Sequence, residues 1–283
     1  MLHENNSDFI AKKIQYFFLI SHGIPFLMTV ILMILEGSIF ISQPFFNQVI
    51  YIAFSSPLVA AGFIISLYYS KEEKNNYWLS IIDFSRIPWK IFLFILLFPV
   101  SIRFFASLIA EKLFITDFQF DLSPQMNLIY IIILLFFGPV PEELGWRGVA
   151  LPLLQKRFGF QRAAIFLGLM WAVWHLPLFF FQGTFQYQFG LFSPLFWNYM
   201  LATIFTSIIL SVIFNESNNS ILAVILFHYM ENLTGQTFTI NTTAEIISNI
   251  VRGIIAIIIF IYYGRKYSEN HSHILEGNTK NDT

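Results

Sequence analysis

The sequence predicts an all-α membrane protein, a polytopic bundle of about eight transmembrane helices with both termini in the cytoplasm. Hydrophobic residues make up 56% of the 283 residues and charged residues only 12%, about half the charge content of an ordinary soluble domain. A soluble protein of this length needs far more polar residues to cover its surface. Eight helices of roughly 20 residues need roughly 160 apolar positions, and 56% of 283 is about 158.

Eight continuous apolar runs are the expected spans, and their continuity favours helices over the alternating strands of a β-barrel. In chain order they are residues 14–35, 49–69, 89–110, 127–144, 163–181, 196–214, 219–233 and 246–263. The first run is too long for the apolar segment of a signal peptide and lacks a small-residue cleavage site, so we expect an uncleaved span. The seventh has only 15 residues, about 22 Å as a helix, which suits the inside of a bundle better than its lipid face.

The basic residues set the orientation of these spans, because cytoplasmic loops of membrane proteins are rich in Lys and Arg. With a cytoplasmic N-terminus, 13 of the 16 basic residues fall in cytoplasmic segments. The external loops hold Lys112 alone, while Arg103 and Arg252 fall inside spans, where we expect them to snorkel or pair. We expect residues 1–267 to form one integral membrane domain, followed by a polar, disordered tail over residues 268–283.

Composition also excludes several classes of function. The net charge is −1 and there is no basic stretch, which argues against nucleic-acid binding. The chain has no Cys, so disulfides, thiolate zinc sites, iron–sulfur clusters and a Cys nucleophile are excluded. The H-E-x-x-H, G-x-S-x-G and P-loop motifs are absent. The sequence has no internal repeat of the kind that marks many transporters.

Ionisable residues inside the predicted spans are costly there and are the first functional candidates. One cluster ends the fourth span with the adjacent carboxylates of Glu142 and Glu143, followed by Arg147. On a helix, Glu143 and Arg147 share a face and can pair. Glu142 points about 100° away and lacks that partner, so it is the carboxylate available for chemistry. The alternative is a charged helix end at the membrane surface, and these residues alone do not decide between the two.

Two further clusters lie in the fifth and seventh spans. His175 stands among aromatic residues, and His228 and Asn232 are four residues apart, so both project from one helix face. Each cluster also has a structural interpretation, His175 as a hydrogen-bonded core residue and the other two as a polar seam between helices. Glu231 is one position off that face, so it either neighbours the cluster or faces a different helix.

The clusters are expected at one depth in the membrane. Counted from the nearest cytoplasmic charge, Glu142, His175 and His228 are 14, 13 and 12 residues along their helices, roughly 21, 20 and 18 Å. We expect Gly148 and Pro152 to break the first of these helices. One carboxylate, two imidazoles and a carboxamide in one layer predict a hydrolytic site. The carboxylate suits a general base toward a water, the imidazoles can hold a metal or position that water, and the carboxamide suits an oxyanion.

With these motifs the sequence resembles the CPBP intramembrane proteases, also called the CAAX protease and bacteriocin-processing (Abi) family, which includes the Ras-converting enzymes. That family carries E-E-x-x-x-R, F-x-x-x-H and H-x-x-x-N or H-x-x-x-D motifs on separate spans. They are matched, in order, by Glu142-Glu143-Leu144-Gly145-Trp146-Arg147, by Trp171 to His175 and by His228 to Asn232. The match covers a motif core of about residues 127–233. Trp171 takes the Phe position, and we expect it to pack beside the site without a part in the chemistry.

The resemblance implies a membrane-embedded endopeptidase that cleaves a peptide bond with a Glu-activated water. The implied roles are water activation by Glu142 and His175, oxyanion stabilisation by His228 and Asn232, and support by Glu143 and Arg147. Zinc or another divalent metal on Glu142, His175 and His228 is compatible with this chemistry, although a glutamate-activated water needs none.

The expected partner is a peptide substrate or the C-terminal tail of a lipidated protein, met within membrane lipid. Short loops and a Phe- and Ile-rich composition favour a bacterial plasma-membrane protein, with a role in bacteriocin processing or self-immunity. The alternative is a non-catalytic membrane protein, either one that confers bacteriocin immunity by binding or a small transporter whose buried charges line a path. Oligomeric state is not indicated.

Overall fold

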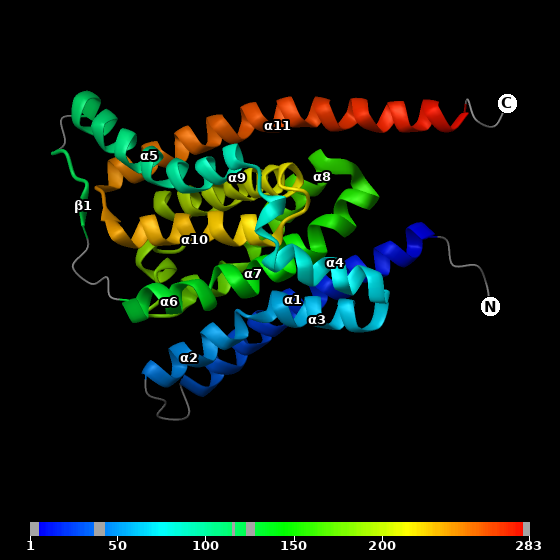
Figure 1. Cartoon of the computed structure of the whole chain (residues 1–283). Helices are drawn as coiled ribbons and strands as arrows, with labels where there is room; N and C mark the ends of the chain where they lie inside the picture. Colours follow the sequence, from blue (N-terminus) through cyan, green and yellow to red (C-terminus); the bar gives the residue numbers. More distant parts are fainter. Residues whose placement is uncertain (1–5, 37–42, 115–116, 123–127, 280–283) are drawn as a thin grey trace.

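The computed structural model describes residues 6–36, 43–114, 117–122 and 128–279 of the chain (Figure 1). The α-helices are α1 (Asn6–Glu36), α2 (Gln43–Ala53), α3 (Ser56–Tyr68), α4 (Lys71–Ile82), α5 (Trp89–Phe114), α6 (Leu128–Phe136), α7 (Pro139–Gly145), α8 (Leu151–Trp174), α9 (Pro194–Glu216), α10 (Ile221–Thr237) and α11 (Thr242–Thr279). The shorter elements are η1 (Phe84–Arg86), η2 (Trp146–Ala150), η3 (Leu176–Phe180), η4 (Gln186–Phe189) and the paired strands β1 (Asp121–Leu122) and β2 (Phe238–Thr239). The predicted all-α fold class is confirmed.

Six helical stretches of the described chain are long and apolar enough to cross a membrane. They are Ser7–Leu35, Gln48–Tyr68, Trp89–Leu113, Ile131–Phe180, Pro194–Glu216 and Thr242–Tyr267. The stretch Ile131–Phe180 has 50 residues, more than twice the roughly 20 residues of one span. The helix α10, which corresponds to the short seventh span, has 17 residues. The chain is therefore a multi-pass membrane protein, while the count of eight spans and the cytoplasmic termini stay predictions.

Prolines divide two of the predicted spans, and a glycine turns the chain ahead of a third. The second becomes α2 and α3, and Pro57 stands in the first turn of α3. The fourth becomes α6 and α7, and Pro139 and Pro141 stand at the start of α7. Proline lacks the backbone N–H that a helix interior needs, so a helix starts there more readily than it continues. In α8, Gly159 has φ 76° and ψ 171°, a conformation that glycine adopts at low cost, and it turns the chain between the two parts of that helix.

The expected helix break at Gly148 and Pro152 is wrong. The elements α7, η2 and α8 follow one another along the chain without an intervening loop. The element η2 is a π-helical turn, in which the N–H of Leu151 bonds to the carbonyl oxygen of Trp146. Pro152 then falls in the first turn of α8, where a missing N–H is tolerated. The chain therefore stays helical through a segment in which Gly148 and Pro152 are expected to end the helix.

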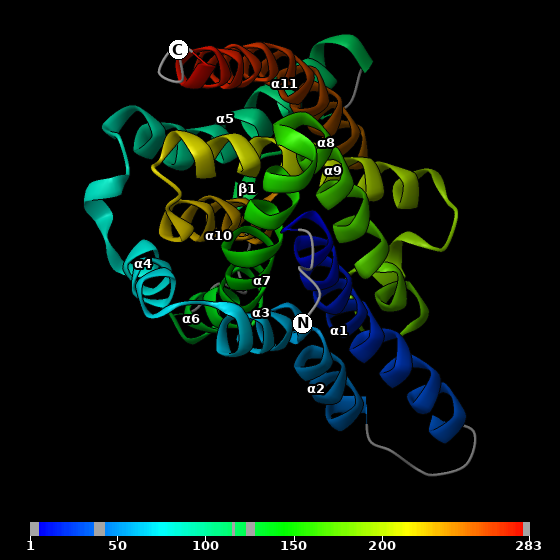
Figure 2. The same ribbon diagram turned by 90° about the vertical axis from the view of Figure 1, so that its right-hand side faces the viewer.

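Helix α7 lies inside the bundle, between two groups of helices (Figures 1 and 2). It contacts α3 on one side and α10 on the other. The first group contains α1, α2 and α3, and the second contains α5, α9, α10 and α11, with α8 packed against both α1 and α9. Buried side chains from most of these helices form one continuous core. The predicted site motifs are carried by α7, η2, α8 and α10, so they lie where the two groups meet.

Helix α10 enters the bundle through a tight turn after α9. Asn218 and Asn219 adopt left-handed φ values of 53° and 58°, which Asn tolerates better than most residues. The Ser220 hydroxyl then caps α10 by accepting the N–H of Ala223 at 3.2 Å. The helix starts at a defined residue, which fixes the positions of the residues farther along it.

The domain boundary predicted at residue 267 concerns the C-terminal part of α11. This helix continues to Thr279, and side chains are described as far as Tyr267. The single membrane domain over residues 1–267 and the disordered tail over residues 268–283 therefore stay predictions.

Candidate active site

Helix α7 carries the two adjacent carboxylates, and glycine and proline fix its position. Pro139 and Pro141 lie in its first turn, where their missing N–H groups have no helical partner to lose. Near its other end, a Cβ on Gly145 would lie 2.5 Å from both the Cβ and the carbonyl oxygen of Pro57 in α3. Such a distance is too short for any real Cβ, so the two helices are in backbone contact at this glycine. Both carboxylates are thereby held at a set distance from α3.

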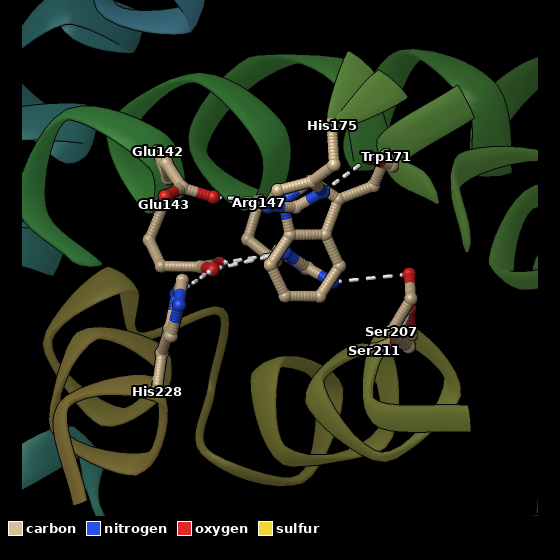
Figure 3. A network of polar contacts seen from close by, with 8 residues as sticks. All are labelled: Glu142, Glu143, Arg147, Trp171, His175, Ser207, Ser211 and His228. Atoms are coloured by element: carbon tan, nitrogen blue, oxygen red, sulfur yellow. Dashed lines mark hydrogen bonds and ion pairs between the residues drawn. The ribbon is translucent and has the colours of Figure 1, made fainter. Parts of the chain in front are cut away.

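Glu143 and Arg147 form a buried ion pair, as their spacing of four residues predicts (Figure 3). The Nη1 of Arg147 donates to both carboxylate oxygens of Glu143, at 2.9 and 3.1 Å. The Nη2 of Arg147 donates to the Ser207 hydroxyl of α9 at 3.0 Å. The Nδ1 of His228 lies 2.8 Å from Oε1 of Glu143. A buried pair is stable only with such additional hydrogen bonds, so these four residues join α7, α9 and α10 into one polar unit.

Glu142 has a different partner from its neighbour. The indole Nε1 of Trp171, in α8, donates to Oε2 of Glu142 at 2.7 Å. The other oxygen, Oε1, makes no hydrogen bond with the residues that the structure describes. Trp171 stands in the Phe position of the second motif, and Phe has no donor to offer. One carboxylate is thus used in an ion pair and the other keeps a free oxygen.

His175 ends α8 and is held there by its own helix. Its backbone N–H bonds to the carbonyl of Ala172 at 3.1 Å, which leaves the carbonyl of Trp171 to the imidazole Nδ1 at 2.8 Å. Because a carbonyl only accepts, Nδ1 carries the proton and Nε2 is a free acceptor. The rings of Trp174 and Tyr199 lie edge-on to the imidazole, with centroids 4.8 and 5.4 Å away. The ring is therefore fixed by an aromatic surround and by one hydrogen bond.

His228 and Asn232 come from α10, one turn apart. The Nδ1 of His228 is engaged with Glu143, as described above, and its ring lies 5.3 Å from the ring of Trp171. The amide Nδ2 of Asn232 lies beside Gly138, where a Cβ would be 3.4 Å away. Gly138 immediately precedes α7, one turn before the carboxylates. Asn232 thus lies next to the start of α7, and it is more exposed than the other residues of the site.

Exposure divides the site residues into two sets. Glu142, His175 and His228 are 8%, 7% and 6% exposed, whereas Glu143 and Arg147 are 0% exposed. The first three side chains each have one polar atom bonded to protein and another that remains available. The ion pair has no exposed surface, so it is suited to hold the other groups rather than to meet a substrate.

Comparison with known proteins identifies the family of the chain. The model of the family "Type II CAAX prenyl endopeptidase Rce1-like" matches residues 124–234. The protein named CAAX prenyl protease 2 of Methanococcus maripaludis is 30% identical over 239 residues, which is 78% of this chain and 85% of the relative. The chain belongs to the Rce1-like CAAX prenyl endopeptidase family. The predicted family resemblance is confirmed, and membership supports a membrane protease. The matched residues include all three motifs.

Membership in the Rce1-like family does not by itself identify every residue of the site. The role of Trp171 as a hydrogen-bond donor was not predicted from the sequence, because an aromatic residue in the Phe position is expected only to pack beside the site. Nor was Ser207 predicted, which accepts from Arg147 and whose carbonyl accepts the hydroxyl of Ser211 at 2.7 Å. Two Ser four residues apart on a predicted span are a weak signal that α9 presents hydroxyls to one side.

Two further ion pairs join other helices of the bundle, outside this site. Glu231 accepts from Nη2 of Arg252 at 2.6 Å, so it faces α11. Arg252 also donates to Asn249 of its own helix. Arg103 pairs with Glu245 at 2.9 Å. Both arginines thus pair within the bundle rather than snorkel.

Glu142, His175 and His228 are the side chains that the sequence predicts as tentative ligands of a divalent metal ion. Among the residues that the structure describes, no three His, Asp or Glu side chains are grouped so that they could hold a metal ion. The tentative zinc site therefore stays a prediction for metal analysis.

Proposed function

We propose that the chain is an intramembrane endopeptidase that hydrolyses a peptide bond with a water activated by Glu142. One observation carries the proposal. Glu142, His175 and His228 come from three separate helices and surround Trp171, and each keeps one free polar atom. An independent structural role for each residue gives no reason for such an arrangement.

In the proposed step, Glu142 takes a proton from the water while the water oxygen bonds to the scissile carbonyl carbon. The carbonyl electron pair moves to its oxygen and forms an oxyanion. When the oxyanion collapses, the C–N bond breaks and the nitrogen takes the proton held by Glu142. The products are a new carboxyl group and an amine. The free Nε2 of His175 accepts a hydrogen bond from the water and orients it toward the carbonyl.

The oxyanion is proposed to lie on the α10 side of the site. A carboxylate only accepts, so Nδ1 of His228 is the donor toward Glu143. In its imidazolium form, His228 also donates from Nε2, toward the oxyanion, and Asn232 adds a neutral N–H. This form balances charge within the site, since two carboxylates then face Arg147 and one imidazolium. Glu143 and Arg147 act by holding His228 and α7 in place.

The substrate is proposed to be the C-terminal tail of a prenylated, membrane-associated protein. The support for it is the family of the chain and the name of its relative in Methanococcus maripaludis, CAAX prenyl protease 2. Processing of a bacteriocin and self-immunity are the other roles predicted from the sequence, and no feature of the described residues favours them over tail cleavage. The non-catalytic alternatives, an immunity protein that acts by binding and a small transporter, require that the site residues bind a ligand without hydrolysing a peptide bond.

The test is a cleavage assay with the full chain in lipid nanodiscs. The substrates are a peptide that ends in a prenylated CAAX tail and the same peptide without the prenyl group. We expect Glu142→Gln to lower kcat by at least roughly 10²-fold, the scale of a lost general base. Glu216→Gln is the matched control, because Glu216 pairs with Lys266 at the end of α9, outside the site. Cleavage by Glu142→Gln at the control rate would contradict the proposal.

Metal dependence is measured in the same preparation. Metal analysis before and after chelator, with cleavage followed in parallel, separates a glutamate-activated water from a metal-bound one. Parallel loss of metal and of activity on chelation would support the tentative metal set of Glu142, His175 and His228. Full activity in metal-free protein would support the scheme written above.

A further inference from the structure

Trp171 contacts four of the other site residues (Figure 3). Its indole N–H donates to Glu142, and its backbone carbonyl accepts from His175. The guanidinium of Arg147 lies over its ring at 4.6 Å from the centroid, and the ring of His228 meets it at 76°. Trp171 is 4% exposed. A buried aromatic residue on a helix usually serves packing alone. Trp171 instead contacts four ionisable side chains, which suggests a second role.

The hydrogen bond acts on the part of Glu142 that is otherwise least fixed. The last torsion of a glutamate side chain is broad and roughly two-fold, so a carboxylate with no donor can turn either oxygen toward a substrate. The Trp171 N–H holds Oε2, and Oε1 is thereby the oxygen that remains for a water. A charge-assisted bond of 2.7 Å is on the strong side for an N–H donor.

The indole itself cannot turn away from this position. A guanidinium lies on its face and an imidazole lies against it, and the guanidinium is fixed in turn by Glu143 and Ser207. Rotation of the ring would require the whole buried unit to move. The donor direction is therefore set by packing before any substrate binds.

We propose that Trp171 is the positioning residue of the general base, because its indole N–H holds one oxygen of Glu142 and directs the other toward the site. The inference rests on the proposed role of Glu142. The indole of Trp171 then acts through its N–H, by orienting Glu142, as well as through the packing of its ring.

The activity test compares two Trp→Phe changes in the full chain in nanodiscs. Trp171→Phe keeps an aromatic ring and removes the N–H. Trp197→Phe is the control, because Trp197 lies near the start of α9, is 54% exposed and packs against Phe192 and Phe196, outside the site. We expect Trp171→Phe to lower kcat by roughly 10- to 100-fold, as a misoriented base does, with KM unchanged. The control should keep the wild-type kcat. Equal kcat values for the two variants would overturn the inference.

A second measurement does not depend on activity or on the folding of the Trp171 variant. In protein labelled with ¹⁵N at Trp, the indole N–H signal of Trp171 should lie downfield and move upfield in Glu142→Gln, with the other Trp signals unchanged. An unmoved signal would overturn the inference even if Glu142→Gln abolishes cleavage. Conversely, cleavage by Glu142→Gln together with a moved signal would refute the proposed function and leave the hydrogen bond established.

Discussion

Gly145→Ala tests whether backbone contact between α7 and α3 sets the geometry of the site. The added Cβ would lie 2.5 Å from the Cβ and the carbonyl oxygen of Pro57. Ordinary carbon contacts begin at roughly 3.5 Å, so the helices must separate by about 1 Å. Overpacking of this kind costs about 1–3 kcal/mol, and a 1 Å displacement of catalytic groups can cost on the order of 10²-fold in rate. The backbone of Gly145 is helical, so the expected loss is steric and not conformational.

The matched control for Gly145→Ala is Gly62→Ala in the facing helix α3. A Cβ on Gly62 meets no atom within 4 Å, and Ala is about 1 kcal/mol better than Gly in a helix. We expect Gly62→Ala to keep or raise the unfolding temperature and to keep kcat, and Gly145→Ala to lower both. Thermal unfolding and peptide cleavage of the two purified variants give the comparison. Equal stability and equal kcat for the two variants would show that the backbone contact at Gly145 does not set the geometry of the site.

Two further predictions concern buried ion pairs. Glu143→Ala and Arg147→Ala should each cost about 3–5 kcal/mol of unfolding free energy, because each leaves one unpaired buried charge. Denaturant unfolding of the double variant should show a loss smaller than the sum of the two, and additive losses would contradict the pairing. Glu231→Ala should lower stability by leaving Arg252 unpaired, without changing the KM for peptide. Exchange of the two residues, Glu231→Arg with Arg252→Glu, should recover part of that stability, and a further loss would argue against the pair.

Membrane helices, and contacts between residues of the same helix, can be predicted from the sequence. Apolar runs of span length indicate the membrane helices, since the bilayer leaves few alternatives for an unbroken apolar segment. The pairing of Glu143 with Arg147 follows from the four-residue repeat. The absence of Arg147 as a partner of Glu142 follows from the same geometry, since adjacent residues on a helix face directions about 100° apart.

Contacts between side chains of different helices cannot be predicted in this way, because they depend on how the helices are rotated against one another. The bond from Trp171 to Glu142 requires α7 and α8 to face each other, and their arrangement depends on the turn at Gly159 and the π-helical turn of η2. Such a π turn also keeps the chain helical at Pro152, which a propensity argument marks as a break. The orientation of Glu231 toward Arg252 has the same origin, because one residue of offset on α10 selects a different neighbouring helix.

The most direct test of the central claim follows the oxygen of the attacking water. Wild-type protein and Glu142→Gln are incubated with the prenylated CAAX peptide in H₂¹⁸O, and the N-terminal product is analysed by mass spectrometry. We expect wild-type protein to place one ¹⁸O in the new carboxyl group, and Glu142→Gln to form this product at least roughly 10²-fold more slowly. Labelled product formed by Glu142→Gln at the wild-type rate would contradict activation of the water by Glu142.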